Sequence, residues 1–178
     1  MTKECFYFDS EPGEVAFLSG VVDVLSDNMS LYCEYAQTMD ADIFYAPDQD
    51  LSKLTEAVKK RMHIYYDNLN EPDMEAKIDE MDFTDLVRKE CNPNAPGIQE
   101  FLKTHKLTAR EEAYYKAEDE FLRQLEWHLE KPVCTFKPSD LQDKNIGVLG
   151  HAYMSFAFTY DFTAYRDYMV LMIHGTSE

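Results

Sequence analysis

Glycine and cysteine are scarce in this 178-residue sequence, which has six glycines and four cysteines. The chain has no glycine-rich phosphate-binding loop of the GxxxxGK[ST] or GxGxxG kind, and it lacks the GxSxG and HExxH motifs of hydrolases and zinc proteases. Its cysteines, at positions 5, 33, 91 and 134, form no CxxC pair, which favours reduced thiols over disulfides or a zinc site. We therefore expect no cofactor and no nucleotide-binding loop.

Long apolar runs are also missing. No run approaches the roughly 20 residues that an α-helix needs to span a bilayer. The first residues, MTKECFYFDSEPGE, contain no basic region followed by an apolar one, so they do not resemble a secretory signal. We expect a soluble, cytoplasmic protein that does not associate with membranes.

Basic residues are absent from a long N-terminal window. From Glu4 through Ser52 there are eleven Asp or Glu residues and no Lys or Arg. The net charge is −17, divided into −13 for residues 1–90 and −4 for residues 91–178. A field of this sign repels phosphate, so we expect no direct binding of nucleic acid, whereas it attracts a basic protein partner. The alternative is that the acidity only keeps the protein soluble.

The densest apolar and aromatic stretch, Val148–Gly175, predicts a β-hairpin at about residues 150–174. Large side chains alternate with small ones from Met154 to Tyr160, as in a half-buried strand. Tyr168–Ile173 is continuously apolar, which is typical of a central strand covered on both faces. We expect a loop of four or five residues within Asp161–Asp167.

Two helices are strongly indicated. Thr108 and Glu111 form a capping-box pattern, which predicts a long helix at about residues 108–131 that ends before Pro132 and covers the hairpin. Apolar residues at helical spacing also predict a helix from Asp50 or Ser52 to about Leu69.

The remaining elements are shorter. We expect strands at Cys5–Phe8, Leu31–Tyr35 and Ile43–Tyr45, with a turn at Asp40–Asp42. Helices are expected from Ser10 to Asp27, in broken form from Met74 to about Cys91, and from Ile98 to about Thr104. Asn92–Gly97 is expected to be a loop, and Phe136–Lys144 a polar connection. Strands, a helical block and a final hairpin predict one α+β domain over residues 1–178, with parts at 1–50, 51–131 and 148–175.

The acidic N-terminal half also contains tyrosines, and a phenol can add apolar area and a hydrogen bond to an interface. The candidate partner-binding residues are Glu34, Tyr35, Asp40, Asp42, Tyr45, Asp48 and Asp50. They predict a non-enzymatic binding or inhibitor protein for a basic partner such as a nuclease or another nucleic-acid-binding protein. In composition and size the chain resembles acidic inhibitors, including immunity proteins and phage anti-defence proteins.

The alternative function is a small hydrolase or metal-binding enzyme. His151 and His174 would be cross-strand neighbours if the hairpin turned between Phe162 and Thr163, and a nearby carboxylate could then complete a site. A turn nearer Ala164 and Tyr165 would separate the two histidines. No spacing motif supports this site, so the sequence favours the binding protein.

Overall fold

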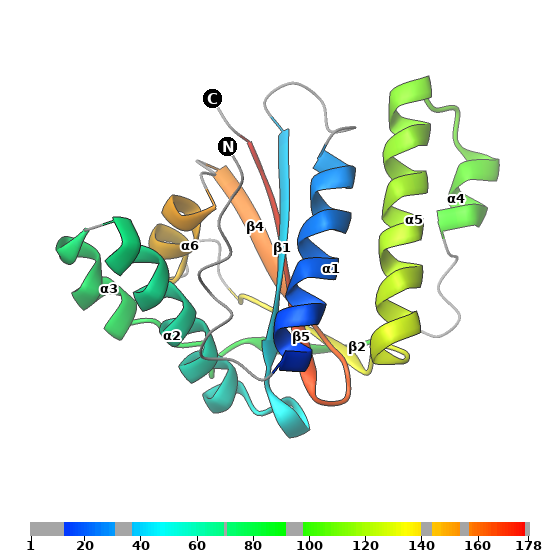
Figure 1. The fold of residues 1–178 in the computed structure, drawn as a ribbon. Coiled ribbons are helices and arrows are strands. Elements are labelled where there is room, and N and C mark those ends of the chain that lie inside the picture. The colour runs from blue at the N-terminus through cyan, green and yellow to red at the C-terminus, as the bar shows by residue number, and fades with distance from the viewer. Residues whose placement is uncertain are drawn as a thin grey trace.

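One five-stranded antiparallel sheet, with helices on both faces, forms the centre of the computed structural model of this chain (Figure 1). The structure describes residues 13–30, 37–69, 71–91, 98–139, 144–153 and 157–176. The strand order is β1-β5-β4-β3-β2. The strands are β1 (Gln37–Tyr45), β2 (Val87–Glu90), β3 (Cys134–Lys137), β4 (Ala157–Ala164) and β5 (Tyr168–Thr176).

Six α-helices and two short 3-10 helices lie within the described residues. They are α1 (Gly13–Ser30), η2 (Pro47–Gln49), α2 (Leu51–Leu69), η3 (Pro72–Met74), α3 (Glu75–Asp79), α4 (Ile98–Thr104), α5 (Ala109–Leu129) and α6 (Ile146–Ala152). Helices α2, α3 and α6 lie on one face of the sheet, here called the α2 face, and α1 and α5 lie on the other, the α1 face (Figure 1). The predicted α+β fold with a C-terminal hairpin is confirmed.

Strand β5 is central in the sheet and covered on both faces, as predicted. Leu171 and Phe162 pack in the hydrophobic cluster under α2, whereas Val170 and Met172 pack in the cluster that includes Phe121 of α5. Burial of each large side chain of this kind contributes about 1.5–3 kcal/mol. The alternation of β5 therefore supplies both cores from one strand.

The hairpin turn is shorter than predicted. Strand β4 continues to Ala164, which is fully buried, so the loop expected within Asp161–Asp167 is wrong in its first half. The turn occupies Tyr165–Asp167, and the Tyr165 N–H donates to the Tyr168 carbonyl over 2.8 Å. Apolar side chains at alternate positions keep the chain in the sheet up to that point.

The predicted capping box of the long helix is confirmed. The Thr108 hydroxyl accepts a hydrogen bond from the Glu111 N–H, and the Glu111 carboxylate accepts one from the Thr108 N–H over 2.7 Å. Phe121 and Leu125 share a buried cluster with Tyr165 at the hairpin turn. Helix α5 therefore covers the hairpin, as expected from the sequence.

Three predicted elements are wrong. Asp40–Asp42 is not a turn, because it lies inside β1, which pairs with β5 from Gln37 to Tyr45. Val87–Glu90 is an edge strand rather than the end of a helix, and it pairs with β3. Phe136, placed in a polar connection, is a buried residue of β3. The helices predicted at 10–27, 50–69 and 98–104 correspond to α1, α2 and α4. Predictions for Cys5–Phe8, Leu31–Tyr35 and Asn92–Gly97 lie outside the described residues.

Within the described part of the chain, no helix has both the length and the apolar character that crossing a membrane requires.

Candidate functional site

The described residues of the predicted binding surface do not all lie on one face of the sheet. Asp40 is on the α2 face, and Tyr45 is on the α1 face, where its ring contacts Tyr168 at a centroid distance of 5.7 Å. Asp48 is exposed in η2. The Asp50 carboxylate accepts hydrogen bonds from two backbone N–H groups at the start of α2, over 2.9 and 3.3 Å. Glu34 and Tyr35 lie outside the described residues.

Asp42, one of the candidate partner-binding residues, is buried. Its side chain forms an ion pair with Arg61 of α2, which is only 5% exposed. The Tyr153 hydroxyl donates to the second carboxylate oxygen of Asp42 over 3.0 Å. Burial, with the Asp42 charge as the next cause, raises the pKa of Tyr153 well above its ordinary value. The Asp42 carboxylate is therefore engaged inside the protein.

The Asp42–Arg61 pair also closes part of the outer edge of β1. The Ile43 N–H donates to the Asp42 carboxylate over 2.8 Å, and the Ile43 carbonyl accepts from the Arg61 guanidinium over 3.2 Å. Both backbone groups of Ile43 point away from β5, where a further strand would otherwise pair. The two side chains of the ion pair therefore provide hydrogen-bond partners for the Ile43 N–H and carbonyl at this edge of the sheet.

His151 and His174 are not neighbours. Strand β4 pairs with β5 in a register that puts Thr159, not His151, opposite His174. His151 lies in α6, on the α2 face, whereas His174 follows Met172 on the α1 face of β5. The hairpin turns four residues later than the pairing of the two histidines requires.

His151 instead contacts Tyr66. The two rings stack at a centroid distance of 5.5 Å, and His151 Nδ1 lies 3.1 Å from the Tyr66 hydroxyl and 3.7 Å from Glu71 Oε2. The Tyr66 hydroxyl donates to the Val148 carbonyl over 2.9 Å, which ties α2 to α6. In the described residues, no group of three or more His, Cys, Asp or Glu side chains is arranged to hold a metal ion.

The buried tyrosines predict alkaline unfolding. Burial is the main cause that raises the pKa of Tyr66, Tyr165 and Tyr153, and it raises the pKa of Tyr168 to about 12. Each raised pKa contributes stability that is complete below the unfolded value of about 10 and is lost as the pH rises toward the folded value. We expect the free energy of unfolding to fall above pH about 10, measured by urea titration. The Tyr165→Phe variant should show a shallower fall, and an unchanged slope would contradict this cause.

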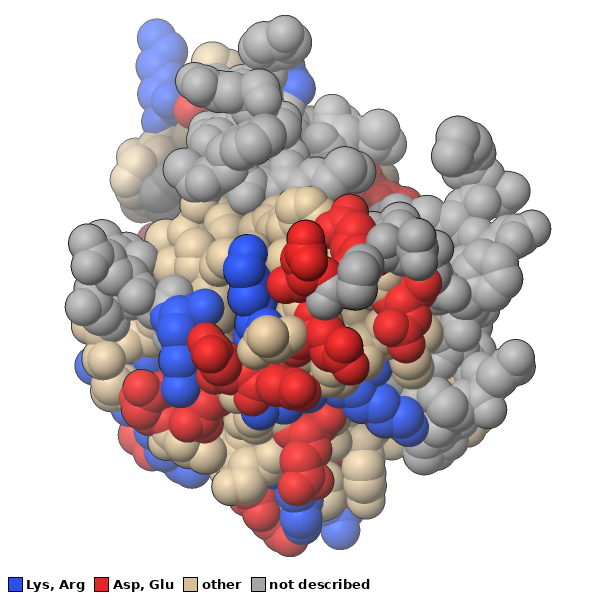
Figure 2. Space-filling model, turned by 90° about the vertical axis from the view of Figure 1, so that its left-hand side faces the viewer, with Lys and Arg blue, Asp and Glu red and all other residues tan. Residues whose placement is uncertain are grey.

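The densest run of acidic residues in the sequence lies elsewhere, between Asp67 and Asp85. This acidic segment has eight Asp or Glu residues and one basic residue, Lys77. Figure 2 shows acidic side chains gathered, with some Lys and Arg among them, on the side of the molecule that carries α2 and α3. Five carboxylates of the acidic segment have no ion-pair partner in the part of the chain that the structure describes. They are Asp67, Asp73, Glu75, Glu80 and Asp85.

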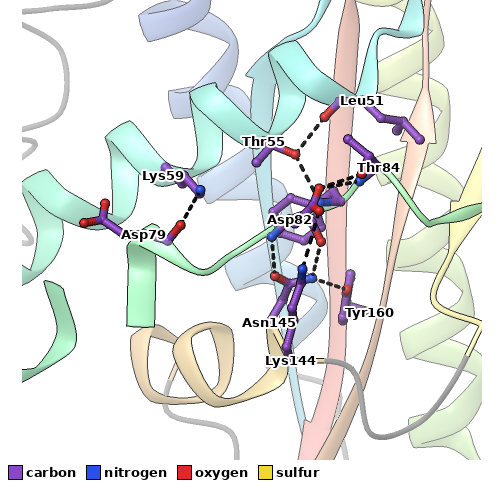
Figure 3. Close-up of polar contacts among 10 residues, drawn as sticks. Leu51, Thr55, Lys59, Asp79, Asp82, Thr84, Lys144, Asn145 and Tyr160 are labelled. Atoms are coloured by element: carbon purple, nitrogen blue, oxygen red, sulfur yellow. Dashed lines mark hydrogen bonds and ion pairs between the residues drawn. The ribbon is translucent and has the colours of Figure 1, made fainter. Parts of the chain in front are cut away.

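Polar side chains brace the acidic segment (Figure 3). The Asn145 side chain is fully buried, donates to the Asp82 carbonyl and accepts from the Asp82 N–H, both over 2.9 Å. The Thr55 hydroxyl accepts from the Phe83 N–H over 3.0 Å, and Lys59 donates to the Asp79 carbonyl over 2.6 Å. Helix α2 and the residue before α6 thus fix the backbone between α3 and β2.

The acidic segment follows the window from Glu4 to Ser52, in which the sequence predicts the binding surface. That window has no basic residue, whereas the acids between Asp67 and Asp85 are closer together. Counting carboxylates per residue would have found the acidic segment. Its backbone bracing depends on Asn145, which is far away in the sequence.

Comparison with protein-family models, with curated proteins and with solved structures finds no match for this chain.

Proposed function

We propose that this protein is a non-enzymatic acidic binding protein that engages a basic surface of a protein partner through its acidic segment. The observation that carries the proposal is the group of five carboxylates that have no ion-pair partner among the described residues, on a segment whose backbone Asn145, Thr55 and Lys59 hold in place. Carboxylates in a fixed arrangement can occupy positions where a basic groove otherwise holds phosphates.

The partner class follows from the same charges. A nuclease or another nucleic-acid-binding protein has a basic groove that matches closely spaced carboxylates, and occupying that groove inhibits it. The net charge of −17 works against direct contact with nucleic acid, because phosphate is repelled. The protein therefore acts as an inhibitor of the immunity or anti-defence type, located in the cytoplasm with its target.

The test combines identification of the partner with charge neutralisation. A partner recovered by affinity capture from the host, or from the host during phage infection, is purified, and its association rate is measured by stopped flow at several salt concentrations. The neutralised variant contains Asp67→Asn, Asp73→Asn, Glu75→Gln, Glu80→Gln and Asp85→Asn. We expect its association to be slower by about 10-fold or more at low salt, because steering by surface charge contributes 10–10³-fold.

A matched control removes the same number of charges from α4, from α5 and from Glu130, the residue directly after α5. It contains Glu100→Gln, Glu112→Gln, Asp119→Asn, Glu126→Gln and Glu130→Gln. Because net charge is then equal, the two variants differ in the location of the removed carboxylates, of which Glu100 and Glu112 form exposed ion pairs within their own helices. Equal slowing by both, or an association rate that does not change with salt, would count against a binding role for the acidic segment.

A further inference from the structure

Helix α1 is apolar on two opposite sides. Val15, Leu18 and Val22 are buried, and the last two pack in the cluster that includes Ile43 of β1 and Phe121 of α5. On the far side, Phe17 is 60% exposed and Val24 is 68% exposed. A helix of a folded protein usually has one apolar stripe and one polar face, and a helix that is apolar all round is covered on both sides. The second side of α1 therefore has the character of a contact surface.

The exposed Phe17 and Val24 form one continuous stripe with the half-buried Gly20 and Val21. Phe17, Gly20, Val21 and Val24 are spaced i, i+3, i+4 and i+7, which places them in line along the helix over about two turns. None of these four residues is charged. We name them the outer stripe. Single exposed apolar residues are ordinary on a protein surface, but contiguous apolar patches mark contacts with other molecules.

Gly20 stands in the middle of the outer stripe. Inside a helix, glycine destabilises more than every other residue type except proline. The interior of this protein does not require it, because a Cβ built at Gly20 has nothing within 4 Å. A missing side chain between Phe17 and Val24 leaves a flat place where a second helix backbone can approach closely.

An aromatic group lies at one end of the outer stripe. The Phe17 ring contacts the His128 ring of α5 at a centroid distance of 5.7 Å. Trp127, which precedes His128 in α5, is 84% exposed. Tryptophan is enriched among the residues that contribute most to binding at protein interfaces.

The charges beside the outer stripe select its occupant. Glu14, Asp23 and Asp27 each lie three residues from a stripe member, and α1 contains no Lys or Arg. Two copies of α1 packed together would place these carboxylates side by side, so a second copy of this chain is disfavoured. An amphipathic helix whose apolar stripe is flanked by Lys and Arg is complementary in both shape and charge.

We propose that the outer stripe of α1 docks a basic amphipathic helix of a partner protein. This surface is distinct from the acidic segment, because α1 and α3 lie on opposite faces of the sheet (Figure 1). Docking at the outer stripe leaves the acidic segment open, so the two surfaces can be occupied at the same time. The inference goes beyond the proposed function and does not depend on it.

The experiment measures binding of a designed 18-residue helical peptide by isothermal titration calorimetry. The peptide has Leu at i, i+3, i+4 and i+7 positions and Lys on both flanks. Two other peptides serve as controls: one has the same composition in scrambled order, and one has Glu in place of Lys. We expect only the first peptide to bind the full chain at a defined one-to-one ratio.

Substitutions then locate the peptide. In the Gly20→Gln variant, the new side chain fills the flat place, and its Cβ clashes with no other part of the protein. The urea midpoint should stay the same or rise, because Gln is a better helix former than Gly. We expect it to weaken peptide binding by about tenfold or more. The matched control is Ala76→Gln, which places the same side chain on exposed α3 across the sheet and should not affect binding.

Four outcomes would overturn the proposal. These are equal binding of the scrambled or Glu-flanked peptide, equal affinity in the Gly20→Gln and Ala76→Gln variants, or loss of peptide binding when the five carboxylates of the acidic segment are neutralised. The fourth is a dimer in sedimentation equilibrium that Gly20→Gln dissociates, which would assign the outer stripe to a second copy of this chain. Failure of the acidic segment to bind a partner would leave the peptide result unchanged, so the two proposals fail separately.

Discussion

The Arg61→Met variant should lose about 3–5 kcal/mol of unfolding free energy. The substitution retains much of the apolar length of the side chain but leaves the Asp42 carboxylate buried without its guanidinium partner. It also removes the donor to the Ile43 carbonyl and the cation over the Phe44 ring, whose centroid lies 4.9 Å from the guanidinium carbon. Because domains of this kind are stable by about 5–15 kcal/mol, the loss is a large share of the total.

The measurement is urea unfolding, in which the midpoint and the dependence of the unfolding free energy on urea concentration are compared between the variants. The double variant Arg61→Met with Asp42→Asn should recover part of the loss, because no buried charge remains and the amide oxygen can still accept from Tyr153. Arg88→Met, at an exposed ion pair with Glu90 on the edge strand, is the control and should change stability by less than about 1 kcal/mol. A loss below about 1 kcal/mol in Arg61→Met would show that Asp42 is hydrated rather than buried.

The second large effect is expected at Asn145. In the Asn145→Ala variant, the N–H and the carbonyl of Asp82 lose their partners, and each group left unsatisfied in a buried place costs about 1–3 kcal/mol. We expect a total loss of about 2–4 kcal/mol. Amide hydrogen exchange at Asp82 should become faster, because the brace between α6 and the acidic segment is gone.

Lys144→Ala is the matched control for this site. Lys144 precedes Asn145 and forms an exposed ion pair with the Asp82 carboxylate at 3.4 Å, so its loss should cost no more than about 1 kcal/mol. Thr84, which donates both its N–H and its hydroxyl to Asp82, is the largest cause that lowers the pKa of Asp82, so Lys144→Ala should leave most of that lowering in place. Equal losses in the two variants would mean that the surface charge, not the buried amide, stabilises this segment.

Local patterns predicted the long elements well. The capping box at Thr108 and the apolar faces of residues 51–69 are written in neighbouring residues, so α5 and α2 could be placed from the sequence. The edge strand at Val87–Glu90 could not, because its four residues are all exposed and only their pairing with Cys134–Lys137 makes them a strand. Short strands of this kind depend on neighbours far away in the chain.

The candidate site illustrates the same limit. Asp42 has the sequence context of a surface carboxylate, and its burial depends on Arg61 in the next helix and Tyr153 near the end of the chain. The acidic segment, by contrast, was visible in the sequence as a local density of charge. Burial of a polar group is a tertiary property, whereas charge density is a local one.

The strand order has a consequence for synthesis of the chain. Among the described strands, β1 has a single neighbour, β5, and their pairing begins with Tyr45 opposite Tyr168. At about 5–20 residues per second, a ribosome needs roughly 6–25 s to extend the chain from one of these residues to the other. During that interval β1 has no partner strand. The buried apolar side chains of α1 can then pack against β1 but not yet against β5. A nascent chain of this protein therefore exposes apolar surface until its last strand has emerged.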